Sequence, residues 1–164
     1  MKITKDKIEL KHLETKHLEA LMNYSLPEDQ INFTALPKLA FERLAERMDN
    51  LAHPITILLD DKPIGFFILD YGDDKIEFTK NENSLLVRSL LINPVYQGLG
   101  YGKVAMKMMD DFVKEYFPTI NELVLAVNFK NRSAYQLYLN VGYVDDGSQR
   151  EWYNGKQHLL KKHI

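Results

Sequence analysis

The chain has 164 residues, of which 45% are apolar and 27% charged, and its formal net charge is −2. These values are typical of a globular protein with one sizeable core, and we expect a single domain over residues 1–164. The weak charge argues against a nucleic-acid partner, which usually requires a basic field. Because there is no cysteine and the five histidines lack ligand spacing, disulfides and thiolate chemistry are excluded and no metal site is predicted.

The N-terminal stretch 1–10 alternates charged and apolar residues and has no apolar segment of the signal-peptide type. The longest apolar runs elsewhere are far too short to span a bilayer. We therefore expect a cytoplasmic protein with no membrane partner.

The first 50 residues predict one strand and two helices. Apolar and polar side chains alternate over Ile8–Leu13, as in an edge strand. Thr15 is the candidate cap of a helix that runs through Met22 and is broken by Pro27. A second helical face follows over Leu36–Met48. The charged residues expected on its outer side are Glu42, Arg43, Glu46 and Arg47.

The middle of the chain predicts a hairpin. Ile55–Leu59 and Ile64–Leu69 are short β-type runs, and the Asp-Asp-Lys-Pro sequence between them is typical of a turn. Gly72–Asp74 forms a second turn, and the polar stretch Lys75–Asn83 leads into an apolar strand that starts at Leu85.

The second half predicts helices and strands in alternation. An amphipathic helix starts at Gly102 and ends before Pro118. Leu123–Val127 is nearly all apolar, as in a strand buried on both faces. A further helix covers Asn131–Val141, with Gly142 at its end. Three short closing strands follow at Tyr143-Val144, Glu151–Tyr153 and His158–Leu160, with Asn154-Gly155 as a hairpin turn.

The resulting order, β α α β β β α β α β β, predicts an α/β (mixed α+β) fold. We expect one mixed, mostly antiparallel sheet of about seven strands with helices on both faces. The stretch from Leu85 to Val127 supplies its one parallel β-α-β crossover.

A glycine-dense loop joins the strand at Leu85 to the next helix. Gly98, Gly100 and Gly102 leave the backbone N–H groups accessible, and the helix N-terminus adds a favourable dipole. Lys103 places a cation beside them. This arrangement predicts a site for an anionic, phosphate-bearing ligand, and a tight turn without any ligand is the alternative.

Two common phosphate loops do not fit. A Walker loop requires a glycine five residues before Gly102 and a Ser or Thr after the lysine, but Val104 follows Lys103. A dinucleotide fingerprint requires G-x-G-x-x-G and repeated parallel crossovers, whereas the spacing here is G-x-G-x-G. The pattern Q/R-x-x-G-x-G/A is matched by Gln97–Gly102.

These residues resemble the GCN5-related N-acetyltransferases (the GNAT family). Leu90–Gly102 resembles the family's fourth strand and pyrophosphate loop, and Asn128–Tyr138 followed by Val-Gly-Tyr resembles its second signature, N-x-x-A-x-x-L-Y-x-x-x-G-F/Y. The resemblance covers the C-terminal half strongly and the first half by topology. It implies a GNAT-like fold whose fourth and fifth strands are splayed by a bulge.

The resemblance also implies an enzyme that transfers acetyl from acetyl-CoA to a primary amine, by direct attack in a ternary complex and without a metal. Tyr138 matches the family's general acid, and the amide of Leu91 or Ile92 would polarise the acetyl carbonyl. The positions that match the family's cofactor-binding residues are Leu90, Leu91, Ile92, Gln97, Gly98, Leu99, Gly100, Tyr101, Gly102, Lys103, Asn128 and Asn131.

Two of these residues have simpler explanations that stay open. Tyr138 lies between Leu137 and Val141 on an apolar helix face, so core packing is the alternative role, although its position in the motif favours the general acid. A tyrosine hydroxyl with a reference pKa near ~10 is nevertheless protonated at neutral pH and able to donate. Asn131 is also placed to cap the helix that it precedes.

The general base is not identified. Some relatives carry a glutamate on the fourth strand, and Leu86 stands at that position here. Five acidic residues are candidates, although a solvated surface charge explains each of them better: Glu28, Asp29, Glu42, Asp73 and Glu82.

The acceptor is open among polyamines, amino acids, aminoglycosides and protein amino groups. Tyr96–Lys103 with Arg88 upstream, and Pro27–Phe33, resemble the branch that includes spermine/spermidine acetyltransferases. A non-catalytic acyl-CoA-binding or sensing domain is the alternative from a different class. Homodimers are usual in the family, although no residue here establishes one.

Overall fold

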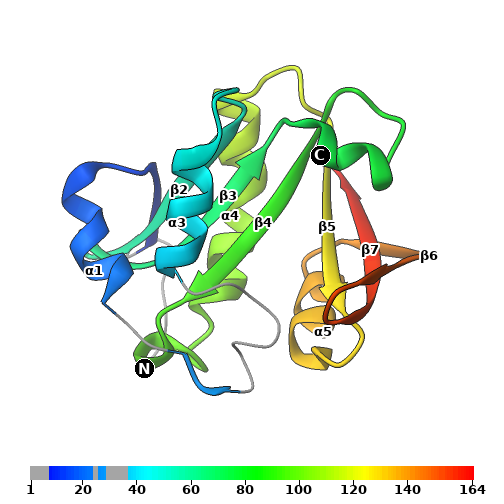
Figure 1. The fold of residues 1–164 in the computed structure, drawn as a ribbon. Helices are drawn as coiled ribbons and strands as arrows, with labels where there is room; N and C mark the ends of the chain where they lie inside the picture. Colours follow the sequence, from blue (N-terminus) through cyan, green and yellow to red (C-terminus); the bar gives the residue numbers. More distant parts are fainter. Residues whose placement is uncertain (1–7, 24–25, 29–36) are drawn as a thin grey trace.

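The computed structural model describes residues 8–23, 26–28 and 37–164. The segment Asp29–Phe33 and Leu36, which entered the predictions above, lie outside the described residues. In chain order the elements are β1 (Ile8–His12), the 3-10 turn η2 (Thr15–His17), α1 (Leu18–Met22), α3 (Pro37–Glu46), β2 (Ala52–Leu59), β3 (Lys62–Asp70), η3 (Asp73–Glu77), β4 (Ser84–Ile92), η4 (Pro94–Tyr96), α4 (Tyr101–Tyr116), β5 (Glu122–Asn128), α5 (Arg132–Asn140), β6 (Val144–Trp152) and β7 (Gly155–His163) (Figure 1).

The strands form one seven-stranded sheet in the order β1-β2-β3-β4-β5-β7-β6. All neighbouring pairs are antiparallel except β4–β5, which is parallel and is connected through α4. The predicted α/β fold, with its mixed sheet and its single parallel crossover, is therefore confirmed.

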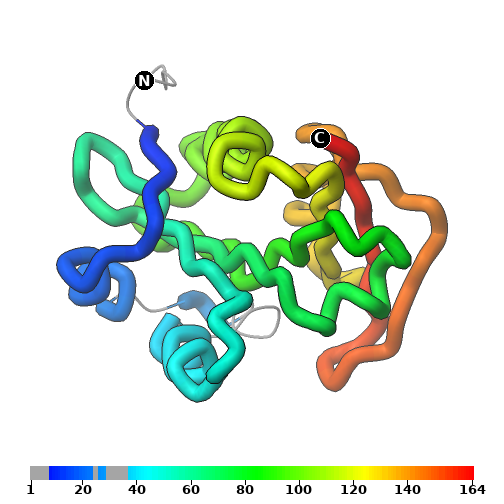
Figure 2. The backbone as a smooth tube through the Cα atoms, turned by 90° about the horizontal axis from the view of Figure 1, so that it is seen from above, coloured from blue at the N-terminus to red at the C-terminus, as the bar shows by residue number. Residues whose placement is uncertain are grey.

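Helices cover both faces of the sheet, as Figure 2 shows for α3 and α4 on opposite sides. Phe66 and Phe67 are neighbours on β3, so their side chains point to opposite faces. The Phe66 ring packs 4.8 Å from that of Phe41 on α3, in a cluster that includes Leu21 of α1. Phe67 belongs instead to the larger cluster around Met106 of α4, which the residues of α5 also join.

Strands β4 and β5 pair only where they begin, from Ser84 opposite Glu122 to Leu86 opposite Val124. Beyond this point they diverge, which Figure 1 shows as a V that opens toward the ends of both strands. The predicted splay of the parallel pair is confirmed.

A β-bulge in β4 accompanies the divergence. Arg88 lies opposite Ile68 and Leu91 opposite Phe66, so two residues of β4 face one residue of β3. Ser89, within the bulge, has a φ of 56°. Such a bulge bends its strand and increases the local twist, which turns β4 away from β5.

Two local predictions were wrong. The residue that precedes the first helical turn is Glu14, whose N–H donates to Nδ1 of His17 over 3.1 Å, so Thr15 is not the cap. The C-terminal strands are two, not three, because the polar stretch after Val144 remains paired with β7 despite a register shift.

The stretch after the turn at Gly72 also differs from the prediction, because it contains the short helix η3. Lys75 in this helix is buried, and its Nζ donates to the carbonyl oxygens of Glu82 and Ser84 over 2.9 and 3.1 Å. The Lys75 ammonium also lies 3.7 Å from the centroid of the Tyr71 ring. These contacts hold η3 against the start of β4.

Candidate functional site

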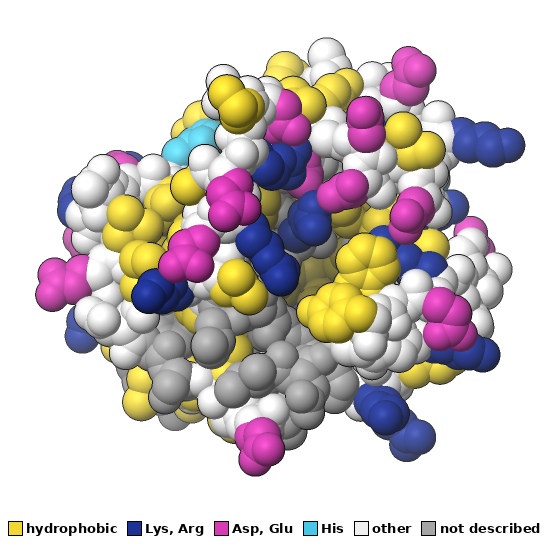
Figure 3. Space-filling model, viewed as in Figure 1, with side chains coloured by type: hydrophobic (Ala, Val, Ile, Leu, Met, Phe, Trp, Pro, Cys, Tyr) yellow, Lys and Arg dark blue, Asp and Glu magenta, His cyan; other side chains and the backbone are white. Residues whose placement is uncertain are grey.

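The gap between the splayed strands is a cleft of about 820 Å³. Residues of β4, β5 and α5, the loop before α4, and the β6–β7 hairpin line it. Figure 3 shows a hollow on the α3 side of the molecule with charged and hydrophobic side chains around it. Of the predicted site residues, all except the exposed Leu99 line this cleft.

The glycine loop presents bare backbone at one end of the cleft. Gly98 and Gly100 have φ values of 75° and 88°, a region that glycine adopts without strain. Gly100 is the N-cap of α4 and supplies no capping side chain. The first N–H groups of α4 therefore lack partners within the helix and, with the helix dipole, favour an anion.

The end of β4 presents peptide groups to the same cleft. Asn93 N–H donates to the Ile64 carbonyl over 2.7 Å, so Asn93 and then Leu91 direct their peptide groups toward β3. Ile92, between them, directs its N–H and C=O to the opposite side, into the cleft. Its carbonyl accepts a 2.7 Å hydrogen bond from Nε2 of Gln97. Of the two amides considered above, the one at Ile92 thus faces the cleft.

Tyr138 reaches the cleft from α5, on the opposite wall. Its side chain is half-buried, and burial raises its pKa to about 12. The hydroxyl therefore keeps its proton at neutral pH. The ring also makes an edge contact with Tyr143, with 5.9 Å between centroids, so the residue has a packing role as well.

The two predicted asparagines are held by local hydrogen bonds. The Asn131 side chain accepts from the Ala134 N–H over 3.4 Å and caps α5. Asn128 accepts from Lys130 N–H and donates to the Asn154 carbonyl, both over 2.9 Å. Both residues line the cleft and also fix the backbone around it.

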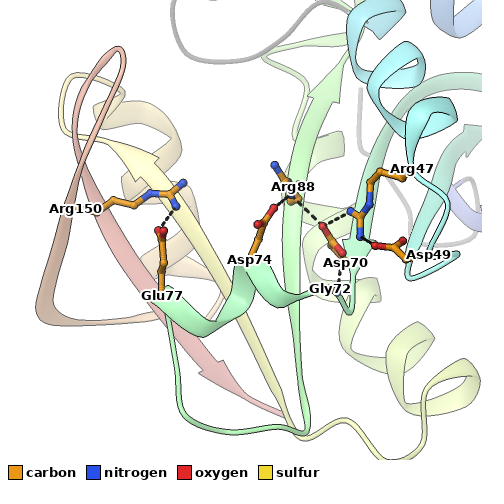
Figure 4. A network of polar contacts seen from close by, with 8 residues as sticks. All are labelled: Arg47, Asp49, Asp70, Gly72, Asp74, Glu77, Arg88 and Arg150. Atoms are coloured by element: carbon orange, nitrogen blue, oxygen red, sulfur yellow. Dashed lines mark hydrogen bonds and ion pairs between the residues drawn. The ribbon is translucent and has the colours of Figure 1, made fainter.

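A buried aspartate organises the other side of the cleft, and no sequence motif indicated it. Asp70, at the end of β3, is only 1% exposed. Its Oδ2 accepts from Nη1 of Arg47 over 2.7 Å and from Nη1 of Arg88 over 3.0 Å, and its Oδ1 accepts from Gly72 N–H over 2.8 Å (Figure 4). Burial alone would raise the pKa of Asp70, but these donors outweigh it and lower the pKa below the ordinary value.

The helical pattern predicted Arg47 on the solvent side of its helix, and this was wrong. Because α3 ends at Glu46, Arg47 leaves the helical periodicity and turns toward Asp70.

Two further ion pairs tie η3 to the walls of the cleft (Figure 4). Asp74 accepts from Arg88 of β4 over 2.6 Å, and Glu77 accepts from Arg150 of β6 over 2.8 Å. The two acidic residues are three positions apart, so they share one side of a 3-10 helix. The Arg150 guanidinium also lies 4.0 Å from the centroid of a ring of Trp152, on the same hairpin.

The four described acidic residues among the general-base candidates do not line the cleft. Glu28, Glu42, Asp73 and Glu82 are exposed and absent from its lining, and Asp29 lies outside the described residues. Within the described ranges, the acidic residues that line the cleft are Asp74 and Glu77.

Among the described residues, no group of three or more His, Asp or Glu side chains is arranged to hold a metal ion. The described helices also include none that is both long and apolar enough to cross a membrane.

A sheet opened between two parallel strands, with a bare glycine loop and a protonated tyrosine at its gap, is the arrangement expected of the N-acetyltransferases. The sequence model of that class, the acetyltransferase (GNAT) family, matches residues 18–143. The chain therefore belongs to the GNAT family and is an N-acetyltransferase, which confirms the resemblance inferred from the motifs.

Individual proteins of similar sequence or structure are also acetyltransferases. The chain is 37% identical over 154 residues to an uncharacterized N-acetyltransferase, YbbJ, of Bacillus subtilis (strain 168), and the match covers 93% of this chain and 95% of that protein. The spermidine N-acetyltransferase of Vibrio cholerae, solved with CoA and spermine, has a TM-score of 0.73 at 17% identity, over 96% of both chains. The aminoglycoside acetyltransferase AAC(6')-Ib, solved with paromomycin and acetyl-CoA, has a TM-score of 0.76 at 16% identity, over 96% of this chain and 94% of that one. At these identities the two structures show a shared fold.

Proposed function

We propose that this chain transfers an acetyl group from acetyl-CoA to a primary amine of a small molecule, by direct attack in a ternary complex, and that residues 1–164 form one acetyltransferase domain. The observation that carries the proposal is the meeting, in one cleft, of the bare loop before α4, the Ile92 amide and Tyr138. The two solved relatives named above contain CoA or acetyl-CoA, one together with a polyamine and the other with an aminoglycoside.

The loop fits a diphosphate. A Cβ added at Gly98 would meet none of the described residues within 4 Å, so the space beside this backbone is open to a ligand. The N–H groups from Gln97 to Lys103 would bind the phosphate oxygens, and the Lys103 ammonium would add charge attraction. Bound there, acetyl-CoA supplies an activated acyl group whose leaving group is a thiolate.

The two walls of the cleft would act at the reacting atoms. The Ile92 N–H would donate to the acetyl carbonyl oxygen as negative charge develops on it. The Tyr138 hydroxyl would hold a proton for the departing sulfur, because it is fully protonated at neutral pH. Deprotonation of an alkylammonium acceptor at neutral pH costs about 3 pK units, or ~4 kcal/mol, and this step falls to water or to a carboxylate that we do not assign.

The direct test is release of free thiol from acetyl-CoA in the presence of a panel of small amines and peptides, with acetyl-CoA affinity measured in parallel by calorimetry. We expect both binding and amine-dependent thiol release. Binding without turnover on any amine would support the acyl-CoA-sensing alternative. Turnover confined to peptide substrates would instead indicate an acetyltransferase of protein N-termini or lysines.

A further inference from the structure

The cleft passes through the sheet and has chemically different ends. Side chains of β4 alternate between the faces: Val87 joins the cluster under α4, whereas Leu86 joins the cluster under η3. Arg88, two residues after Leu86, points to the η3 side and contacts Asp74 there. The loop before α4 and Tyr138 belong to the α4 and α5 side, so the η3 side is the one open to an acceptor.

The charged groups on this acceptor side are arginines and carboxylates, and most of them are paired with one another. Three guanidinium groups line it, those of Arg43, Arg88 and Arg150, against two carboxylates within the described ranges. Both carboxylates are already paired with arginines, at 2.6 and 2.8 Å. Arg43 is exposed on α3 and has no ion-pair partner in the part of the chain that the structure describes.

The three arginines differ in how many of their N–H donors remain available to a ligand. Arg150 donates through Nε to Gln157 and through Nη1 to Glu77, and it stacks on Trp152. Its donors are therefore largely used by contacts within the protein. Arg88 uses only Nη1, which it shares between Asp70 and Asp74, and no described residue engages its Nε or Nη2. The Arg88 side chain is 40% exposed. Asp70 thus fixes the position of Arg88 through Nη1, and the Nε and Nη2 groups of Arg88 remain able to donate to a ligand.

We propose, resting on the acetyltransferase function above, that the acceptor amine also carries a carboxylate, and that Arg88 binds this carboxylate with Arg43 adding positive potential. A guanidinium presents a planar fork of donors that matches a carboxylate. Asp74 and Glu77 on the same side are placed to attract the ammonium group of such a zwitterion. A polyamine carries no carboxylate to accept from the remaining donors of Arg88, and its positive charges would repel Arg43.

The test compares amines with and without a carboxylate. Matched pairs are lysine and cadaverine, and phenylalanine and phenethylamine, with spermidine as a polycation. Thiol release gives kcat/KM for each. We expect the carboxylate-bearing member of at least one pair to be preferred about 10-fold or more. Arg88→Gln should reduce this preference about 10-fold, in line with the loss of a charge-assisted hydrogen bond, and Arg43→Gln should reduce it about threefold.

Lys38→Gln is the matched control, because Lys38 is an exposed cation on the same helix as Arg43 but does not line the cleft. It should leave the preference unchanged. Arg88→Gln is expected to fold, since Asp70 keeps its hydrogen bond from Arg47. Preference for cadaverine, phenethylamine or spermidine, or an unchanged preference in Arg88→Gln, would overturn the proposal.

If no amine in the panel is acetylated, it is the proposed function that fails. The proposed carboxylate site is then tested by calorimetry, which measures the affinity of the same pairs for the protein saturated with coenzyme A. Tighter binding of the carboxylate-bearing member that depends on Arg88 supports a carboxylate site, and equal binding of both members refutes it.

Discussion

Tyr138 is the residue whose chemical role is most directly testable. If its hydroxyl protonates the departing sulfur, Tyr138→Phe should lower kcat about 10²-fold and leave acetyl-CoA affinity nearly unchanged, because the lost interaction acts late in the reaction. Tyr135→Phe is the matched control, since Tyr135 lies on the same helix but donates to Asp145 outside the cleft. Normal turnover of the Tyr138 variant, measured as thiol release, would leave Tyr138 with a packing role only.

The raised pKa of Tyr138 adds a pH criterion. The protonated form is the active one, and it persists until the pH approaches about 12. Tyr138 should therefore contribute no loss of kcat between about pH 6 and pH 10. Profiles of the wild type and of Tyr138→Phe should differ in height and agree in shape over this range.

The loop between β4 and α4 is the element that should control coenzyme affinity. Gly98 and Gly147 form a matched pair, because both have a positive φ, of 75° and 88°, and a Cβ on either meets no described residue within 4 Å. Alanine at either position should cost stability by about 1 kcal/mol through the strained backbone. Gly98→Ala alone should also weaken acetyl-CoA binding, by about 10-fold, because only that Cβ intrudes on the proposed diphosphate site. Equal affinity in both variants, measured by calorimetry, would show that the loop does not hold the ligand.

The long helices were predictable because their apolar residues recur at helical spacing, a pattern that lies within one short stretch of the sequence. The helix η3 was not, since it has five residues and its central lysine is buried through carbonyl groups that follow it in the chain. The polar stretch of β6 also broke the alternation expected of a strand. Its pairing comes from β7, which the local pattern does not contain.

The stability of the whole molecule should depend on Asp70, which joins β3 to the segment after α3 and to β4. Its lowered pKa means that its contribution is present above the ordinary pKa of an aspartate and is lost as the pH falls through the folded-state value. Asp70→Asn should lower the free energy of unfolding by about 1–3 kcal/mol at pH 7. The variant should also lose less stability than the wild type between about pH 5 and pH 2, as measured by urea unfolding.

Asp73→Asn is the control for this change, because Asp73 is exposed and makes no ion pair with the described residues. It should leave both the stability and its acid dependence unaltered. The same acid dependence in wild type and Asp70→Asn would show that the Asp70 network does not contribute to stability.

The acceptor side of the cleft likewise belongs to the whole molecule. Motif resemblance pointed toward the polyamine branch through Arg88 and the loop. The folded chain instead gathers Arg43, Arg88 and Arg150 from α3, β4 and β6 around two neutralised carboxylates. The motif associates Arg88 with polyamine acceptors, whereas its surroundings in the folded chain favour a carboxylate-bearing acceptor.

Sequence patterns alone were enough to identify the family, the order of most elements and almost all residues of the proposed coenzyme side. These features depend on residues that are close in the chain. Examples are the glycines that leave the loop backbone accessible, the helix that begins next to them, and apolar side chains at helical spacing. The folded structure was needed to show which β4 amide faces the cleft, which arginines pair with the acids of η3, and how Asp70 is buried. Those outcomes depend on contacts between distant segments, such as Arg150 and Glu77, which are 73 positions apart, and no local pattern encodes such a contact.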